Sequence, residues 1–500
     1  MPLSRSDREM GRLWRLTAIG LDRLGRTRPW LSTHGFAVAL CATVLIAGAV
    51  RVYKLDYQSL WSDEIFSLIT TDPNLSVSEF WARVRADTHP PIYYLLLRLS
   101  SSVFGQSELA ARAPSAVFGI LTLCAAAMLP GSSLSRGARL ALPLLIAASP
   151  GAAWYDREAR PYALLLLLST LITLACLRFV SAMPGAVGKA RGAIAMLTAA
   201  AVLASFTHYF GFLVSAAAFT TCFLLTGRRH KSIVAFAGCS VLALFVLWVV
   251  YHSRFVDTRL AEWIANFPLT ASIDWFSYLS FGGTAPLVPF VAAALIFFAA
   301  GGWRELGAWN TPIYACTLVC VLTLAAAVVV SLHTAILTSR NMIVVLPALY
   351  MIAAELASYL VRRWGTFVGA TYLAAQTALM SQPIVDYYTK EMKEEWRDTA
   401  ALVLNTPGCE AGTIYVYGDA AYYRFFTGAV RPGLRLLEIR EGDSADLSRE
   451  PASACPILLW VVGSSWNADD IRARLGLSDN SFGIADFYEA FLVFRNPPYT

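Results

Sequence analysis

Long apolar segments follow one another through the first three quarters of the chain, separated by short polar connections. A run of roughly 17–25 apolar residues is long enough to cross the hydrocarbon core of a bilayer as a helix. The pattern therefore predicts an α-helical polytopic membrane protein with about eleven transmembrane helices. The predicted spans are residues 36–53, 108–129, 138–153, 161–179, 193–207, 211–226, 233–251, 286–302, 312–332, 342–361 and 365–381.

The pattern changes near Gln382, where shorter apolar stretches alternate with polar residues. Such alternation is typical of a small α/β domain. Helices are expected at Lys393–Leu404, Ala420–Phe426 and Asp469–Leu475, and strands at Thr413–Tyr417, Leu434–Ile439, Pro456–Gly463 and Ala490–Phe494. We therefore divide the chain into a basic N-terminal segment (1–35), a transmembrane domain (36–381) and a C-terminal α/β domain (382–500).

Composition agrees with this division: 57% of the 500 residues are hydrophobic and only 15% are charged. The net charge of +6 is carried mostly by Arg in short loops, which excludes the continuous basic face of a nucleic-acid-binding protein. Seven of the nine Cys lie in apolar segments and are interpreted as small buried hydrophobes. Cys409 and Cys455 lie in the C-terminal domain, where they are either two free thiols or one disulfide bond.

Lys and Arg are concentrated in alternate connections, and the side rich in Lys and Arg should be cytoplasmic. This bias places the N-terminal segment in the cytoplasm. The first long outer loop (54–107) and the C-terminal domain then lie on the opposite face. Within that loop, Pro90-Pro91 suits the first turn of a helix over Ile92–Phe104. This helix is too short to span a bilayer and is expected in the membrane interface.

The outward-facing connections contain acidic, basic and aromatic side chains at or beside helix ends. The set comprises Asp63, Glu64, His89, Asp156, Arg157, Glu158, Arg160, His208, Tyr209 and Arg340. Acidic residues this close to a bilayer cost free energy unless they face water, a partner or a substrate. A carboxylate can take a proton from a hydroxyl, while Arg and His can hold a phosphate. Glycosyl transfer from a lipid phosphate needs that pair of properties.

Several motifs in these connections resemble the membrane-embedded glycosyltransferases of the GT-C class. They are Asp63-Glu64 after the first span, His89-Pro90-Pro91-Ile-Tyr-Tyr, Glu108-x-Ala-x-Arg112-x-Pro114, Trp154-Tyr155-Asp156-Arg157-Glu158-Ala159-Arg160-Pro161, Thr207-His208-Tyr209-Phe210, Ser339-Arg340-Asn341 and Glu395-Trp396-Arg397. More narrowly, the chain resembles the family of aminoarabinose, galacturonic acid and protein mannosyl transferases that use polyprenyl-phosphate sugars. The resemblance covers roughly residues 36–430.

The resemblance implies an inverting transfer from a polyprenyl-phosphate sugar to a glycolipid, lipopolysaccharide, cell-wall glycan or protein acceptor. Asp63 would be the catalytic carboxylate with Glu64 beside it, and Glu158 would be the second acidic position. His89 stands where some members have a phosphate-binding Lys. Arg160 and Arg340 are the further candidates for the phosphate, and Tyr93, Asp156, His208 and Tyr209 are the candidate substrate contacts. Some relatives hold a divalent metal near the carboxylates, for which Asp63 and Glu158 would be the ligands.

Each of these residues also has a structural interpretation. Asp63 and Glu64 could be charges at a helix N-terminus, Glu158 could pair with Arg157 or Arg160, and Arg340 could be an interfacial anchor. Two other functions stay open: a transporter or flippase for a lipid-linked sugar, and a non-catalytic scaffold for envelope glycans. The chain shows neither repeated halves nor a matching pair of broken spans, which disfavours a transporter. A bacterial inner membrane is the expected location, with the site facing outward.

Overall fold

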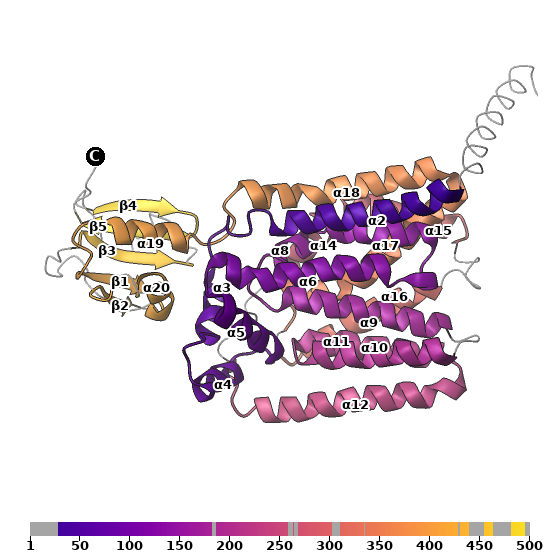
Figure 1. The fold of residues 1–500 in the computed structure, drawn as a ribbon, viewed down its shortest axis with the longest axis horizontal. Coiled ribbons are helices and arrows are strands. Elements are labelled where there is room, and N and C mark those ends of the chain that lie inside the picture. Colours follow the sequence, from indigo (N-terminus) through magenta and orange to yellow (C-terminus); the bar gives the residue numbers. More distant parts are fainter. Residues whose placement is uncertain are drawn as a thin grey trace, which may run out of the picture.

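The structure is a computed structural model that describes residues 29–182, 187–258, 264, 269–302, 311–334, 336–428, 431–439, 455–463 and 482–495. Figure 1 shows a bundle of long, roughly parallel helices with a smaller domain beyond one of its ends. The basic segment before residue 29 and the helix expected at 469–475 lie outside the described residues.

Helical structure occurs at all eleven predicted spans. The bundle comprises α2 (Pro29–Val52), α6 (Glu108–Met128), α7 (Arg136–Ala147), α8 (Pro150–Tyr155), α9 (Tyr162–Ala182), α10 (Val187–Ser205), α11 (Tyr209–Leu225), α12 (Arg228–His252), α14 (Leu269–Phe281), α15 (Leu287–Ala299), α16 (Thr311–Ser331), η4 (Arg340–Val345), α17 (Leu346–Trp364) and α18 (Thr366–Thr389). By length and composition, six helical segments of the described chain are long and apolar enough to cross a membrane. Shorter apolar helices accompany them, and the chain is a multi-pass integral membrane protein.

Burial separates central helices from peripheral ones. In α9, 83% of the most apolar window is buried inside the protein, against 17% for the window in α2. A helix that is apolar on all sides but exposed needs lipid around it, whereas one that is buried serves as core. Accordingly, α9 belongs to the core of the bundle, whereas α2 lies along its edge (Figure 1).

The first outer loop folds into three short helices at the end of the bundle that faces the smaller domain (Figure 1). They are α3 (Ser62–Thr70), α4 (Val77–Ala86) and α5 (Ile92–Phe104). Helix α5 begins directly after Pro91, as the sequence predicted, because Pro suits a position where no backbone donor is needed. Ser76 and Glu79 form a capping box that begins α4.

The C-terminal domain has a mixed five-stranded sheet in the order β2-β1-β3-β5-β4. Its elements are α19 (Trp396–Asn405), β1 (Thr413–Tyr417), α20 (Ala420–Thr427), β2 (Arg435–Ile439), β3 (Ile457–Val462), β4 (Phe482–Phe487) and β5 (Ala490–Arg495). Strand β1 is parallel to β2 and β3, whereas β5 is antiparallel to β3 and β4. Strand β4 was not predicted, since Gly483 and Asp486 interrupt its apolar pattern.

The outer loop and the C-terminal domain share one hydrophobic core. Leu60, Ile65 and Tyr94 from the outer loop belong to the same buried cluster as Trp396 and Trp460 from the C-terminal domain. Packing of this kind excludes water from both surfaces and holds them at a fixed distance. The C-terminal domain is thereby held against the loop that carries the candidate carboxylates.

Candidate functional site

The first turn of α3 directs its two adjacent carboxylates into different surroundings. Successive side chains on a helix point about 100° apart, so Asp63 and Glu64 cannot share one environment. Glu64 is completely buried, whereas the Asp63 side chain keeps 33% of its surface exposed. Only Asp63 is therefore open to a ligand from outside.

Glu64 is surrounded by donors on every side. Arg112 donates to both of its oxygens, from Nε to Oε1 at 2.8 Å and from Nη2 to Oε2 at 2.7 Å. The backbone N–H of Ala159 donates to Oε1 at 2.8 Å and Lys393 Nζ to Oε2 at 3.2 Å. Although burial raises the pKa of a carboxyl group, Arg112 and Lys393 together lower the pKa of Glu64 to about 2. These contacts give Glu64 a structural task, since Arg112 also binds the carbonyl oxygens of Leu55, Gln58 and Ser59.

Asp63 lies between two guanidinium groups from distant parts of the chain. Arg340, at the start of η4, donates to Oδ2 at 2.6 Å, and Arg160 Nη2 lies 3.8 Å from the same atom. Partial burial would raise the pKa of Asp63, but the charges of Arg160 and Arg340 outweigh it and lower the pKa below its ordinary value. Asp63 is thus an ionised carboxylate beside two permanent cations.

The two Arg residues are held by further contacts. Arg160 donates to the Ser67 hydroxyl at 3.1 Å and to the Asp63 carbonyl at 3.3 Å. Its Nε is buried and has no hydrogen-bond partner among the described residues. The Arg340 side chain lies 5.4 Å from the centre of the Trp61 ring and is 25% exposed. The arrangement can bind an oxyanion, for which paired guanidinium groups are well suited.

His89 faces the same cluster from the loop before α5. Its Nδ1 is 3.0 Å from Asp87 Oδ2, which also accepts from Tyr94 at 2.6 Å. Its ring packs edge-on against that of His208 with centroids 5.2 Å apart. His208 caps α11 by accepting from the backbone N–H of Phe210 at 3.2 Å. Burial lowers the pKa of His208 well below the usual range, so this imidazole is neutral.

Glu158 pairs with a residue that sequence analysis missed. Its Oε1 accepts from Trp154 Nε1 at 2.6 Å and lies 3.2 Å from Lys393 Nζ. The alternatives of an ion pair with Arg157 or Arg160 were both wrong. Arg157 instead binds the carbonyl oxygens of Arg51, Tyr53 and Lys54 and stacks on Tyr388.

Three candidate substrate contacts are occupied by other parts of the protein. Asp156 forms a buried ion pair with Arg51 at 2.5 Å. Tyr93 is 1% exposed and its hydroxyl lies 3.4 Å from that of Ser115. The Tyr209 hydroxyl is bound to His252 Nδ1 at 2.5 Å. Of the four candidate substrate contacts, only His208 lies against the group formed by Asp63, His89, Arg160 and Arg340.

The site also contains Asp87, Arg112 and Lys393, which were not predicted as site residues from the sequence. Asp87 precedes His89 by two residues, a spacing that could have suggested a carboxylate–imidazole pair. Arg112 belongs to one of the motifs that resemble GT-C enzymes, but the motif alone indicates no role for it. The pattern around Lys393 predicts an amphipathic helix, and no neighbouring residue indicates that this Lys is buried.

The charged cluster does not fit a divalent metal. Among the described residues, no three His, Cys, Asp or Glu side chains gather as metal ligands. Asp63 and Glu158, the two expected ligands, are instead paired with Arg and Lys. A metal cation at either carboxylate would be repelled by these positive charges unless it displaced them.

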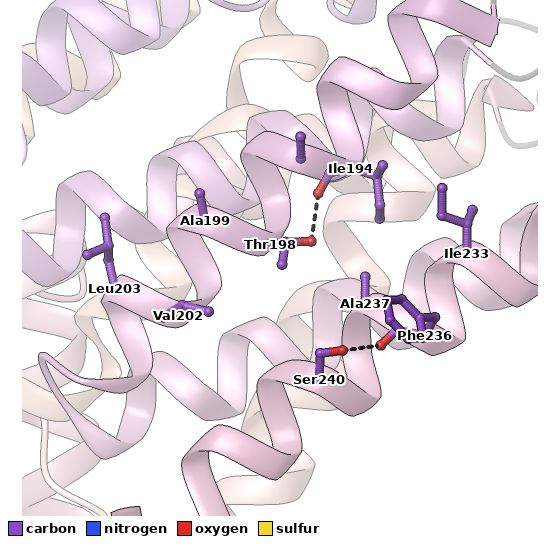
Figure 2. A pocket seen from close by; sticks show the side chains of 10 residues that line it. Ile194, Thr198, Ala199, Val202, Leu203, Ile233, Phe236, Ala237 and Ser240 are labelled. Atoms are coloured by element: carbon purple, nitrogen blue, oxygen red, sulfur yellow. Dashed lines mark hydrogen bonds between the residues drawn. The ribbon is translucent and has the colours of Figure 1, made fainter.

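A groove of about 690 Å³ lies away from this cluster, between α10 and α12. Figure 2 shows that the hydroxyl groups of Thr198 and Ser240 turn back to the carbonyl oxygens of Ile194 and Phe236 in their own helices. The groove therefore presents an almost wholly apolar surface at the side of the bundle. It has no group able to perform the chemistry of the charged cluster.

Comparison with known proteins agrees with this geometry. Residues 88–252 match the family described as dolichyl-phosphate-mannose-protein mannosyltransferase. The fold is similar to that of ArnT from Cupriavidus metallidurans in the apo state, with a TM-score of 0.58 and 16% identity over 93% of this chain and 98% of that one. ArnT bound to undecaprenyl phosphate gives a TM-score of 0.55 with the same identity and coverage.

Archaeal oligosaccharyltransferase AglB from Archaeoglobus fulgidus, in complex with an inhibitory peptide and a dolichol-phosphate, gives a TM-score of 0.52 and 12% identity over 81% of this chain and 64% of that one. No curated protein matches the chain by sequence. These matches show that the chain shares the fold of ArnT, and that its residues 88–252 resemble the dolichyl-phosphate-mannose-protein mannosyltransferase family.

Proposed function

We propose that this protein is an inverting glycosyltransferase that moves a sugar from a polyprenyl-phosphate donor to an acceptor of the cell envelope. The observation that carries the proposal is the position of Asp63 between Arg160 and Arg340. A part-exposed carboxylate and two guanidinium groups at the end of a membrane bundle can handle both a hydroxyl and a lipid phosphate.

The reaction assigns a separate task to each group. The acceptor oxygen bonds to the sugar carbon while the bond from that carbon to the phosphate oxygen breaks. Asp63 aligns the acceptor hydroxyl or takes its proton, and Glu158 assists. Arg160, Arg340 and His89 steady the phosphate, which leaves as a stable anion and needs no separate acid. His208 borders the substrate, whereas Tyr93, Asp156 and Tyr209 support the surrounding structure.

We place the site and the C-terminal domain on the extracytoplasmic face of a bacterial inner membrane. The excess of Lys and Arg in alternate connections supports this orientation. The bond between Cys409 and Cys455 supports it independently, because disulfides persist in oxidising compartments. The donor would then enter from the outer leaflet.

The likeness to ArnT and AglB supports a polyprenyl-phosphate donor, since the solved structures contain undecaprenyl phosphate and dolichol-phosphate respectively. The acceptor is a glycolipid, lipopolysaccharide, cell-wall glycan or protein. The shared core of the outer loop and the C-terminal domain brings that domain beside Asp63. We infer that the C-terminal domain covers the site or helps to bind the acceptor.

The proposal is tested by mass spectrometry of lipid extracts and envelope glycans from cells with and without the gene. Cells carrying Asp63→Asn should lose one sugar decoration and accumulate a polyprenyl-phosphate sugar. Asp72→Asn is the matched control, because Asp72 lies in the same outer loop and its carboxylate binds Asn74 at the surface. Unchanged glycans together with a lipid-linked sugar on the wrong leaflet would contradict the transferase function and indicate a flippase instead.

A further inference from the structure

Lys393 places an ammonium group between two carboxylates deep in the protein. Its Nζ is 3.2 Å from Glu64 Oε2 and 3.2 Å from Glu158 Oε1, and its side chain is 2% exposed. The rings of Trp61 and Tyr387 lie 5.8 and 6.0 Å from Nζ. A Lys this deeply buried stays charged only where carboxylates surround it, and its pKa is raised accordingly.

The segment that carries Lys393 connects α18 to α19 and is fastened to the outer loop on both sides of this residue. Before it, Gln58 donates to the carbonyl oxygens of Tyr387 and Lys390 and accepts from the backbone N–H of Met392. After it, Glu394 accepts from the backbone and hydroxyl of Ser62 at 2.9 and 2.5 Å. The position of Lys393 is therefore set by the docking of the C-terminal domain.

One carboxylate oxygen of Glu158 is hydrogen-bonded and the other is not. Oε1 is bound by Trp154 and Lys393, whereas Oε2 is buried and meets no hydrogen-bonding group in the described part of the chain. A buried carboxylate oxygen without a partner is costly, and it marks a place where a ligand group can bind.

The groups around Glu158 have opposite effects on its pKa. Burial and the neighbouring Glu64 raise the pKa of Glu158, while Lys393 and Arg340 lower it, with a net rise. The charged and titratable groups that face this pair are Glu64 on α3, Tyr93 on α5, Arg112 on α6, Tyr155 on α8, Arg340 on η4 and Tyr387 on α18. Lys393 itself is the cation bonded directly to Glu158.

We propose that Lys393 is a positioning residue for sugar transfer: it keeps Glu158 ionised and turned so that Oε2 accepts a hydrogen bond from a substrate hydroxyl. This inference rests on the proposed function. It also gives the C-terminal domain a defined part in the reaction, because the docked linker supplies the charge on which Glu158 depends.

The test compares Lys393→Met, Lys393→Arg and Lys390→Met in transfer assays across pH. Loss of the ammonium raises the pKa of Glu158, and each unit of rise above the assay pH lowers its ionised fraction tenfold. Lys393→Met should lower kcat/KM at neutral pH about tenfold or more and move the acid limb of its pH profile upward. Lys393→Arg should restore the profile at least in part. Lys390→Met is the control, because its ammonium pairs with Asp386 and is 66% exposed.

An equal loss of kcat/KM at every pH, without a shift of the acid limb, would overturn the proposal. A second measurement does not depend on activity: infrared titration of the protonated carboxyl band that Glu158→Gln removes. In Lys393→Met this band should appear at higher pH than in the unaltered protein, and an unmoved band would also overturn the proposal. If no variant, including the unaltered protein, transfers sugar while the band shifts, the proposed function fails and the control of Glu158 by Lys393 stands.

Discussion

Arg340 donates to Asp63 at 2.6 Å although the two residues are 277 positions apart in the sequence. The bond joins the beginning of η4, late in the transmembrane domain, to the first turn of α3 in the first outer loop. Trp61, two residues before Asp63, lies under the same guanidinium at 5.4 Å. Arg340 is therefore held both by a charge and by an aromatic face, in a fixed orientation toward Asp63.

We predict that Arg340→Ala lowers kcat for sugar transfer about a hundredfold or more, the usual loss when one donor to a developing anion is removed. Arg340→Lys should recover only part of the rate, because an ammonium cannot reproduce the planar guanidinium. Turnover of a polyprenyl-phosphate sugar by purified protein measures the effect. Arg363→Ala, in the last turn of α17, is the control. A full rate in Arg340→Ala would remove this residue from phosphate binding.

Glu64 should behave as a structural residue, unlike Asp63 beside it. Glu64→Gln leaves the buried charge of Arg112 incompletely paired, which typically costs about 3–5 kcal/mol. We expect a marked fall in the thermal unfolding midpoint of Glu64→Gln in detergent and a small change for Asp63→Asn, whose side chain is 33% exposed. Glu410→Gln, at the surface, serves as the control. Equal midpoints for Glu64→Gln and Glu410→Gln would contradict the structural assignment.

The hydrophobic pattern was enough to predict the bundle. Each span must form its backbone hydrogen bonds within its own helix and present apolar side chains to the lipid. The same logic located β1 and α5. It could not separate Asp63 from Glu64, since both are acidic and adjacent. Their difference arises from Arg112 and Arg340, which only the tertiary fold brings to them.

The role of Lys393 was even harder to predict from the sequence. Its local sequence, with Glu394 and Glu395 after it, is typical of a solvated helix start. Its burial is imposed by contacts of its neighbours with Gln58 and Ser62, more than 300 positions earlier. Pairing of this kind leaves no periodic pattern in the sequence.

Acid should weaken the protein through Glu64 in a defined range of pH. Its pKa is about 2 in the folded protein against an ordinary value of 4.5, so the unfolded state binds the proton first as pH falls. The stabilisation, about 3 kcal/mol, is complete above the ordinary value and disappears as pH falls from about 4.5 toward 2. The unfolding midpoint, measured against pH, should therefore fall more steeply in the unaltered protein than in Glu64→Gln. Parallel curves would show that Glu64 is not the responsible group.

The Cys409–Cys455 bond should be detectable by counting thiols. The chain has nine Cys, of which seven are free in the described structure. Alkylation of denatured protein should therefore label seven thiols without reductant and nine after reduction. Replacing both Cys409 and Cys455 by Ala should destabilise the C-terminal domain by about 2–4 kcal/mol, since a link across 46 positions restricts the unfolded chain. Nine labelled thiols without reductant would refute the bond.

Gly119 on α6 should be intolerant of any side chain, because it lies against the buried pair of Asp156 and Arg51. A Cβ atom at Gly119 would lie 2.3 Å from Asp156 Cγ, well inside contact distance. Asp156 cannot yield without leaving Arg51, its partner at 2.5 Å, as a buried charge. We expect Gly119→Ala to lower the free energy of unfolding by about 3 kcal/mol, even though Ala favours helix.

Gly192→Ala provides the matched comparison for this substitution. Gly192 lies within α10 and a Cβ there would meet nothing within 4 Å. The same change should therefore be neutral or stabilise the protein by up to about 1 kcal/mol, through helix propensity alone. Thermal unfolding midpoints of the two variants, measured in the same detergent, should move in opposite directions or differ widely. A tolerated Gly119→Ala would mean that Asp156 and Arg51 do not pack against α6 as described, and the loop carrying Glu158 and Arg160 would then lack the support assigned to it.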